Sequence, residues 1–519
     1  MEQKERKSFF QKFLDSVEKI GNKLPNPVTL FVILAVLVII ISQILEMMGV
    51  SVSYDASKTV DGVAQIVKTE AKVISLMNVE GVRYIFSTMI KNFVAYPPLG
   101  VVLVAMLGVG MAEGTGLVDV LLKKTVSSTP KRFITLMLVF LGVMSNVASD
   151  VGYVVLIPLG AVIFLSLGRH PIAGLAAVFA GVSGGFSANL LVGPIDSMLG
   201  GISTASANII SHGYEVQATA NWFFMIASTF VITIIGAFVT ERIIEPRLGS
   251  YIPKDDHDID MGEITKEEEK GLKWAGITVL IYIIALLLMT VPKNAILRNP
   301  ETGLLMSKSA FNDGLVPIIA LAFFLPGLVY GIVAKTVKNN NDVAAFLGKS
   351  MSSMGGFLVL AFVSSQFIAY FSHSNLGIVM AVKGAEFLEN AGIKGIGLLV
   401  GFVLVSAFIN LFIGSASAKW SIMAPIFVPM FMRLGYSPEL TQLAYRIGDS
   451  STNIITPLMT YFALIIAFAK KYDEDIKIGT LTSIMLPYSM MFLIGWTILL
   501  IIWLALGLPI GPGTPLTFA

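Results

Sequence analysis

Apolar runs long enough to cross a lipid bilayer recur along almost the whole chain. A hydrocarbon core about 30 Å thick takes roughly 20 apolar residues of helix to span, and nine stretches come close to that length. They lie at residues 28–50, 97–117, 172–199, 220–244, 272–292, 315–335, 345–372, 437–469 and 480–507. The pattern predicts an all-α integral membrane protein with nine transmembrane helices.

Two further apolar stretches, 133–167 and 395–432, are each interrupted near the middle by a small polar patch, at 145–150 and 414–419. Polar backbone at membrane depth is tolerated only where it is buried in protein or lines a water-filled cavity. We therefore interpret both stretches as re-entrant helical hairpins whose tips point inward. Hydropathy alone fits equally well two short full spans joined by a tight surface turn.

The positive charges predict the orientation of the chain and suggest that it contains an inverted repeat. With the N-terminus in the cytoplasm, cytoplasmic segments carry 23 Lys and Arg and external segments 11, as the positive-inside rule requires. Five spans then separate the hairpins, so they enter from opposite sides. Segments 185–194 and 448–457 also resemble each other, with Gly and Pro nine residues apart. Such breaks are expected of the discontinuous helices of inverted-repeat transporters, although a match this short can arise by chance.

These features divide the chain into four parts. An amphipathic cytoplasmic N-terminus is predicted at 1–27, a first repeat half at 28–244, an acidic cytoplasmic linker at 245–271 and a second half at 272–519. The run at 28–50 is too long for the apolar core of a cleaved signal peptide. A polar external stretch before the second span contains an amphipathic segment, 79–93, that is suited to the membrane interface.

Composition supports the membrane assignment and excludes several classes of protein. The chain of 519 residues is 55% hydrophobic and only 13% charged, against roughly 25% charged in soluble proteins. A net charge of +2 gives no sign of a nucleic-acid partner. The absence of cysteine excludes disulfides and thiolate metal sites. No Gly-rich phosphate loop followed by Lys-Ser or Lys-Thr is present, which argues against ATP-driven pumping.

Charged residues at membrane depth mark the candidate chemistry, because each costs at least about 2.5–3.5 kcal/mol at a helix centre. Arg446 and Asp449 are three residues apart on one helix face and are predicted to pair. That pair is either purely structural, or Arg446 receives a substrate carboxylate while Asp449 exchanges a proton or a cation. Asp196 follows the first helix break, or is an interfacial acid. Asp150 is either a helix cap or a site residue, and Lys419 follows the second tip.

Neutral oxygen donors cluster at the two hairpin tips and the two helix breaks. Each alone more often bonds its own helix carbonyl, but broken helices also coordinate Na⁺ in transporters. We predict a possible Na⁺ near Asn146, Asn189, Asn410 and Asp449, and no other cofactor. The wider set of helix-break and candidate ion-site residues is Ser145, Asn146, Ser149, Asp150, Ser187, Asn189, Ser415, Ser450, Thr452 and Asn453. Trp420 either stacks on an aromatic ligand or packs in the core.

Several of these motifs together resemble the p-aminobenzoyl-glutamate transporter (AbgT) family. The similar segments are 17–27, 145–153, 181–189, 414–420 and 445–453. The resemblance implies a homodimeric bacterial inner-membrane protein related to the ion-transporter superfamily, with nine transmembrane helices and two opposed hairpins. It links the chain to p-aminobenzoyl-glutamate, a folate catabolite, and to sulfonamide efflux by an antiporter that uses the proton motive force. The implied substrate-path residues are Asp196, Asn410, Ser417, Trp420, Pro438, Arg446, Asp449 and Pro457.

The sequence therefore favours a secondary transporter of a small aromatic anion, driven by a proton or sodium gradient, and not an enzyme. Its expected partners are the small-molecule substrate, the lipid bilayer and a second copy of the chain. Two alternatives are an intramembrane aspartyl protease that uses Asp196 and Asp449, and a passive channel. The sequence leaves open the direction of transport and the coupling ion.

Overall fold

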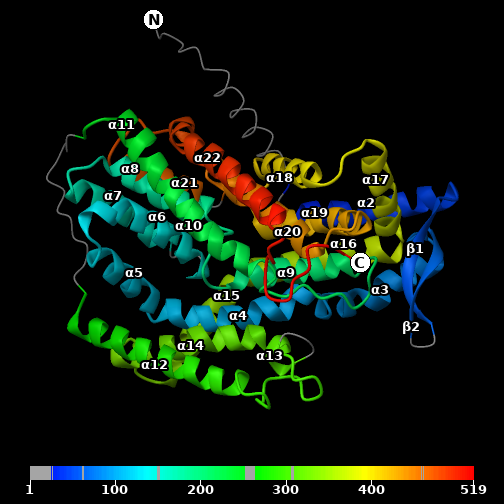
Figure 1. Cartoon of the computed structure of the whole chain (residues 1–519), viewed down its shortest axis with the longest axis horizontal. Helices are drawn as coiled ribbons and strands as arrows, with labels where there is room; N and C mark the ends of the chain where they lie inside the picture. Colours follow the sequence, from blue (N-terminus) through cyan, green and yellow to red (C-terminus); the bar gives the residue numbers. More distant parts are fainter. Residues whose placement is uncertain are drawn as a thin grey trace, which may run out of the picture.

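A computed structural model describes residues 25, 27–60, 63–148, 152–251, 264–305, 309–456, 459 and 461–518. The fold is almost entirely helical (Figure 1). The helices up to the middle of the chain are α2 (Pro27–Met47), α3 (Val79–Val94), α4 (Pro97–Gly114), α5 (Leu117–Ser127), α6 (Ile134–Ser145), α7 (Ile157–Ser166), α8 (Pro171–Phe179), α9 (Pro194–Ala207), α10 (Trp222–Val239) and α11 (Glu245–Leu248). The remaining helices are α12 (Lys266–Thr290), α13 (Ala310–Asp313), α14 (Leu315–Val333), α15 (Asn340–Ser353), α16 (Gly355–His373), α17 (Leu376–Asn390), α18 (Ile396–Asn410), α19 (Ala416–Arg433), α20 (Pro438–Asn453), α21 (Phe462–Lys470) and α22 (Ile478–Ala505).

Six helical stretches among the described residues are long and apolar enough to cross a membrane, and a bent pair raises the number to seven. The six are formed by α2, α10 with its extension to Leu248, α12, α14, α16 and α22. On α12 the apolar side chains of Leu280, Ile281 and Leu288 are exposed by 58%, 62% and 69%. A helix that is apolar all round and yet exposed is suited to contact with lipid. The chain is therefore a multi-pass membrane protein.

Two of the predicted spans differ from the structure. The segment 97–117 continues beyond its expected end, because α4 turns by 63° into α5 at Gly116, which has a φ of +86°. The segment 345–372 is two helices. One of them, α15, is a polar helix that starts at a capping box formed by Asn339 and Asp342, and it docks on α4 through Ser350. Hydropathy averaged over a window cannot resolve such a short polar helix from the apolar helix beside it.

Helices extend into both ends of the segment predicted as an acidic linker. Helix α10 continues through a π-helical turn into α11, and α12 already begins at Lys266, inside the expected linker. Thr265 and Glu268 form a capping box there, and acidic residues in the first turn favour the positive end of the helix dipole. Residues 252–263 and the predicted N-terminal segment, except Pro25 and Pro27, lie outside the described residues.

The stretch before the second span, predicted to be external, contains a hairpin of two antiparallel strands, β1 (Ser51–Val60) and β2 (Val63–Lys72), which the sequence did not predict. The amphipathic helix expected at 79–93 is present as α3. Gln366 fixes α3 against α16, since its amide donates to the Met89 carbonyl at 2.9 Å and its carbonyl accepts from Asn92 at 3.0 Å. The strands lie beside α3 at one end of the molecule (Figure 1).

The helix pairs α6–α7 and α18–α19 occupy the two stretches interpreted as hairpins. Helix α6 has 12 residues and α18 has 15, so at 1.5 Å per residue they are about 18 and 23 Å long. Both are shorter than a hydrocarbon core of about 30 Å.

Both predicted helix breaks are present. In the first half α8 continues through a π-helical turn to Gly184, and α9 starts only at Pro194. In the second half α20 ends at Asn453 and α21 starts at Phe462. Gly448 is not at the break, as the match with Gly185 suggested, but inside α20.

Helices α4, α12, α14 and α15 pack on one another along one side of the molecule, and the helix pairs and broken helices lie on the other (Figure 1). Helix α9 contacts α4 on the first side and α19 and α20 on the second. It therefore separates the two groups at the level of the first break.

Candidate functional site

Helix α20 carries most of the candidate chemistry, and all 16 of its residues are buried although many are polar. Ser437 caps its start by accepting from the Leu440 amide at 3.1 Å, and Pro438 occupies its first turn. Gly448 allows α18 to lie directly against α20, because a Cβ there would be 2.3 Å from the Val403 carbonyl oxygen. Buried polar groups must find partners, and α20 finds them on α18, α19 and α9.

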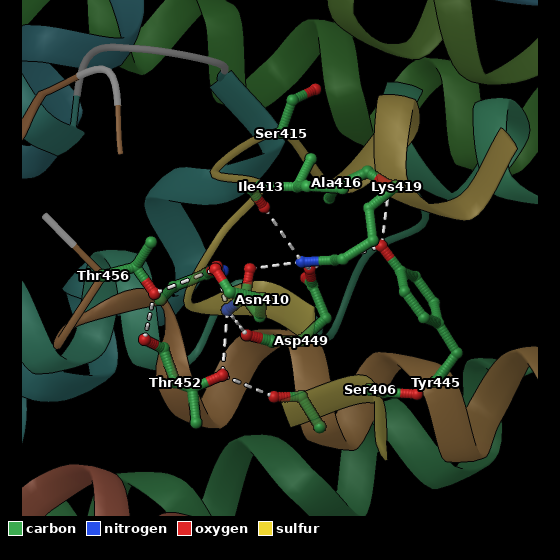
Figure 2. Close-up of polar contacts among 12 residues, drawn as sticks. Ser406, Asn410, Ile413, Ser415, Ala416, Lys419, Tyr445, Asp449, Thr452 and Thr456 are labelled. Carbon is green, nitrogen blue, oxygen red and sulfur yellow. Dashed lines mark hydrogen bonds and ion pairs between the residues drawn. The ribbon is translucent and has the colours of Figure 1, made fainter. Parts of the chain in front are cut away.

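An ammonium group lies at the centre of the contact between α20 and the second helix pair (Figure 2). The Nζ of Lys419 forms an ion pair with Oδ1 of Asp449 and donates to Oδ1 of Asn410. It also lies 3.5 Å from the backbone oxygen of Ile413, between α18 and α19. Lys419 is completely buried. Three oxygens, one of them charged, therefore surround this cation.

Asn410 joins α18 to the end of α20. Its Nδ2 donates to the Asp449 carbonyl at 2.6 Å, to Oγ1 of Thr452 at 2.9 Å and to Oδ1 of Asn453 at 2.9 Å. The backbone oxygen of Asn410 accepts from the Thr456 hydroxyl at 3.2 Å (Figure 2). The structure thus brings together four of the residues that the sequence analysis selected in the second half.

Arg446 points from α20 toward the first helix break. Its Nη2 donates to Oδ1 of Asp196 at 2.6 Å, and both side chains are 2% exposed. Oδ2 of Asp196 accepts from the Gly193 amide at 2.7 Å, which caps the start of α9. The Nε and Nη1 donors of Arg446 are buried and have no hydrogen-bond partner among the described residues.

The predicted pairing of Arg446 with Asp449 is wrong. Each of these residues instead pairs with an opposite charge from another element, Arg446 with Asp196 and Asp449 with Lys419. Spacing along one helix shows only that two side chains share a face. It cannot show which partner a neighbouring helix brings closer.

Trp420 is a core residue in this conformation. Its ring is fully buried and stacks on Tyr445 at 4.4 Å and 25°. Its indole Nε1 donates to Oγ of Ser203 on α9 at 2.9 Å, and that hydroxyl bonds Oε1 of Gln442 at 2.6 Å. Trp420 therefore joins α19, α20 and α9, and the stacking face predicted for a ligand is already covered by Tyr445.

In the first half, Asn side chains also bond to a backbone carbonyl near a helix break, but with fewer polar partners than Asn410 has. The Val143 carbonyl accepts from Nδ2 of Asn146 at 3.0 Å and from Nδ2 of Asn189 at 3.3 Å. These contacts bring the end of α6 and the first break together. Oδ1 of Asn146 is buried and has no hydrogen-bond partner among the described residues. Ser145 donates to its own helix at 2.7 Å, as is common for serine in helices.

The two halves meet directly. Nδ2 of Asn453 lies 3.5 Å from the Ser183 carbonyl, and the Ser183 hydroxyl lies 2.9 Å from the Met459 sulfur. Tyr153 of the first hairpin stacks on Tyr461 of the second break at 4.4 Å and 15°. Both breaks and the described ends of both helix pairs thus converge on one region.

The other candidate residues vary in their distance from this centre. Ser187 is buried beside the first break, Ser450 has a buried hydroxyl without a partner among the described residues, and Ser415 caps α19 and contacts Ser417 at 3.3 Å. Pro438 lies 11 residues before Asp449 on α20, about 16 Å along the axis. Ser149, Asp150 and Pro457 lie outside the described residues.

Sequence reasoning missed Ser183, Ser203, Gln442 and Tyr445. Tyr445 donates to the Ala416 carbonyl at 2.6 Å and lies 3.3 Å from Oδ1 of Asp449. Its position one helical turn before Asp449 is a signal that could have identified it. Ser203 and Gln442 give no such signal, since their role depends on how α9 packs on α20.

A cavity of about 470 Å³ lies on the far side of α9 from the ion pairs. Ser197, Gly201 and Thr204 of α9 line it, at the spacing of one helix face. Asp196 and Ser203, seven residues apart, belong to another face and contact Arg446 and Trp420. The remaining lining residues are Val94, Ala95, Tyr96, Pro97, Gly100, Val104, Glu215, Val216, Gln217, Ala218, Asp313, Leu315, Val316 and Pro317.

The polar contacts of this region extend to Tyr214 and Glu439. Tyr214, in the connection between α9 and α10, donates to the Glu439 carboxylate, with oxygen distances of 2.9 and 3.1 Å. Burial, and secondly the charge of Glu439, raise the pKa of Tyr214 above its ordinary value. Among the described residues no three His, Asp or Glu side chains gather as a metal site.

Comparison with known proteins places the chain in a family. The AbgT putative transporter family matches residues 12–518. The p-aminobenzoyl-glutamate transport protein of Escherichia coli (strain K12) is 41% identical over 497 residues, which cover 96% of this chain and 95% of the relative.

Two solved structures are similar over nearly the whole chain. MtrF of Neisseria gonorrhoeae, described as illuminating a class of antimetabolite efflux pumps, has a TM-score of 0.91 and 50% identity, and the match covers 97% of this chain and all of that one. The YdaH transporter of Alcanivorax borkumensis has a TM-score of 0.87 and 45% identity, over 94% of this chain and all of that one.

The relatives are transporters, and the protease alternative is wrong. It also conflicts with the geometry, because Asp196 and Asp449 are bound to different cations and do not face each other across a shared site. The chain belongs to the AbgT putative transporter family, and it is a membrane transporter and not an enzyme.

Proposed function

We propose that the chain is a secondary active transporter that carries p-aminobenzoyl-glutamate or a related small aromatic anion or antimetabolite, such as a sulfonamide, driven by a proton or sodium gradient. The functions given for the Escherichia coli and Neisseria gonorrhoeae relatives support these substrate classes. The proposal includes nine membrane crossings with two re-entrant hairpins, a homodimer, and a bacterial inner-membrane location with a cytoplasmic N-terminus.

The observation that carries the proposal is the incomplete pairing of Arg446. One donor of its buried guanidinium binds Asp196, while Nε and Nη1 have no partner among the described residues. A buried donor without a partner costs about 1–3 kcal/mol. A substrate carboxylate accepts hydrogen bonds from a guanidinium and would lower this cost at whichever of the two donors it binds. Arg446 is therefore our candidate for the substrate carboxylate.

An aromatic substrate can reach this guanidinium only if the surrounding helices move. Trp420 and Tyr445 cover each other, and both are buried. Helix α9 lies between Arg446 and the cavity. The distribution of Lys and Arg along the chain predicts that this cavity opens on the external side. We propose that the hairpins and broken helices move against α4, α12 and α14, so that the centre is exposed to each side in turn. The substrate path would include Asp196, Asn410, Ser417, Trp420, Pro438, Asp449 and Pro457.

Asn146 supports a cation site in the first half. Its Oδ1 is buried without a partner among the described residues and lies next to a carbonyl that already receives two amide donors. Na⁺ binds at such unwound backbone carbonyls in transporters of this type. A proton carried by a carboxyl group at the same centre is the other candidate for coupling.

The test is substrate flux in proteoliposomes with pH and Na⁺ gradients imposed separately. We expect accumulation driven by one of the gradients, and its loss in Arg446→Gln. Arg247→Gln is the matched control, because Arg247 lies at an exposed site and, among the described residues, hydrogen-bonds to Ser483. Flux that only equilibrates the substrate and ignores both gradients would contradict the proposal and favour a channel.

A further inference from the structure

The Lys419 ammonium is surrounded by the kinds of oxygen that also bind a monovalent cation. Besides the Asp449 carboxylate, it contacts the Asn410 amide oxygen and the Ile413 backbone oxygen (Figure 2). The ammonium has three N–H donors, and because it is buried each of them needs an acceptor. One carboxylate, one amide oxygen and one carbonyl from a hairpin tip are also ligands of the kind that coordinate Na⁺ in transporters.

The location of Lys419 strengthens this interpretation. It lies in the first turn of α19, which begins at Ala416 after the Ser415 cap. The start of a helix carries a partial positive charge, so a cation is disfavoured there. Lys419 is nevertheless fully buried at this end of the helix. The surrounding oxygens must therefore hold the ammonium against the helix dipole.

The first half offers a direct comparison. Asn146 follows the first arm of its hairpin as Asn410 ends the first arm of the other. Both donate through Nδ2 to a backbone carbonyl. The Oδ1 of Asn410 accepts from Lys419, whereas the Oδ1 of Asn146 has no partner among the described residues. One half thus carries its own cation at this oxygen and the other half does not.

We propose that Lys419 is a tethered cation whose ammonium fills the monovalent-cation position of the second half, so that only the first half can take up an exchangeable ion. This inference deepens the proposed function and rests on it. Without the lysine side chain, the oxygens of Asn410, Ile413 and Asp449 remain and bind a small monovalent cation from solution.

The experiment measures thermal unfolding of the purified full chain in detergent. Wild type, Lys419→Ala and the double variant Lys419→Ala/Asp449→Asn are titrated with NaCl and with methylammonium chloride, against choline chloride at constant ionic strength. Ligand that binds only the folded state raises the unfolding temperature in a saturable way. Lys383→Ala is the matched control, since Lys383 forms an exposed pair with Glu386.

We expect Lys419→Ala to unfold at a lower temperature in choline and to recover with Na⁺ or methylammonium. Wild type, Lys383→Ala and the double variant should not respond to methylammonium. If Lys419→Ala folds only when one of these cations is present, the proposal is equally supported. The proposal would be overturned if Lys419→Ala showed no saturable recovery, or if the double variant responded equally. It would also be overturned if Lys419→Ala failed to fold with every cation while the double variant folded.

Transport adds an independent reading in the same variants. If Na⁺ drives wild-type flux, the Hill coefficient for Na⁺ should rise by about one in Lys419→Ala. A wild type without gradient-driven flux would contradict the proposed function alone, because the unfolding measurement does not depend on transport.

Discussion

Replacing Arg446 by methionine removes one charge from a buried ion pair and keeps most of the side-chain volume. Asp196 would then retain a single hydrogen bond, from the Gly193 amide at 2.7 Å, and its position in the first turn of α9. Both side chains are 2% exposed in the wild type, so water cannot replace the lost guanidinium without structural change. We expect Arg446→Met to destabilise the folded state strongly.

The magnitude follows from the geometry of the pair. At the observed 2.6 Å, two unit charges attract by about 6 kcal/mol at an effective dielectric constant of about 20. Desolvation of both charges offsets much of this attraction, and breaking such a pair from one side costs about 3–5 kcal/mol. The helix start returns roughly 0.3–1 kcal/mol to the Asp196 carboxylate. We therefore expect a loss of about 3 kcal/mol in Arg446→Met, and a similar loss in Asp196→Asn.

A double-mutant cycle separates this account from a simple loss of packing. Reversible unfolding in mixed micelles is measured for both single variants and for Asp196→Asn/Arg446→Met. Because the double variant leaves no charge unpaired, its cost should be at least about 2 kcal/mol below the sum of the single costs. The exposed pair of Lys383 and Glu386 is the control, with a coupling of about 0–1 kcal/mol. Additive costs at Arg446 and Asp196 would refute the reasoning.

Two further predictions concern packing and pH. Gly448→Ala would place a Cβ 2.3 Å from a backbone oxygen of α18, so in the same assay it should lower the free energy of unfolding by about 1–3 kcal/mol. The control Gly401→Ala, with no atom within 4 Å of its Cβ, should leave that free energy unchanged. Equal effects of the two variants would contradict the close approach of α18 and α20. Burial lowers the pKa of His170 from 6.5, and the charges of Asp473 and Glu245 oppose this with smaller effects. The neutral form of His170 therefore contributes folding stability above pH 6.5, and this stability is lost as the pH falls toward the lowered pKa. His170→Asn keeps a cap acceptor for the Ile172 amide, and between pH 8 and pH 5 it should lose less unfolding stability than wild type; identical pH profiles would count against this.

The membrane-spanning part of the fold was predictable because its physical signal is local. An apolar run of about 20 residues has few stable places other than a bilayer, and α2, α12, α14 and α22 lie close to where the sequence placed them. The signal failed where local composition is ambiguous. The polar helix α15 was merged with α16, and the β1–β2 hairpin gave no apolar periodicity that distinguished it from a loop.

The candidate site was predictable in its residues but not in its pairs. The cost of burying charge selected Asp196, Lys419, Arg446 and Asp449, and all four are buried by at least 98% in the structure. Their partners depend on the packing of α9 and α19 against α20, which spacing along the chain does not encode. The same limit applies to Trp420, whose buried contact with Ser203 depends on the position of α9.

The charges of the centre constrain how transport can be driven. Two buried cations, Arg446 and Lys419, pair with two buried acids, Asp196 and Asp449, so these four charges sum to zero. An anionic substrate that enters this low-dielectric region adds an unbalanced negative charge, and burying an unpaired charge is strongly unfavourable. A proton or a metal cation that enters with the substrate restores neutrality. Because Lys419 cannot leave, it cannot serve as this additional cation. If the proposed anionic substrate binds here, this balance of charge favours coupling to a mobile cation, and we expect that cation to bind at the Asn146 oxygen that has no partner among the described residues.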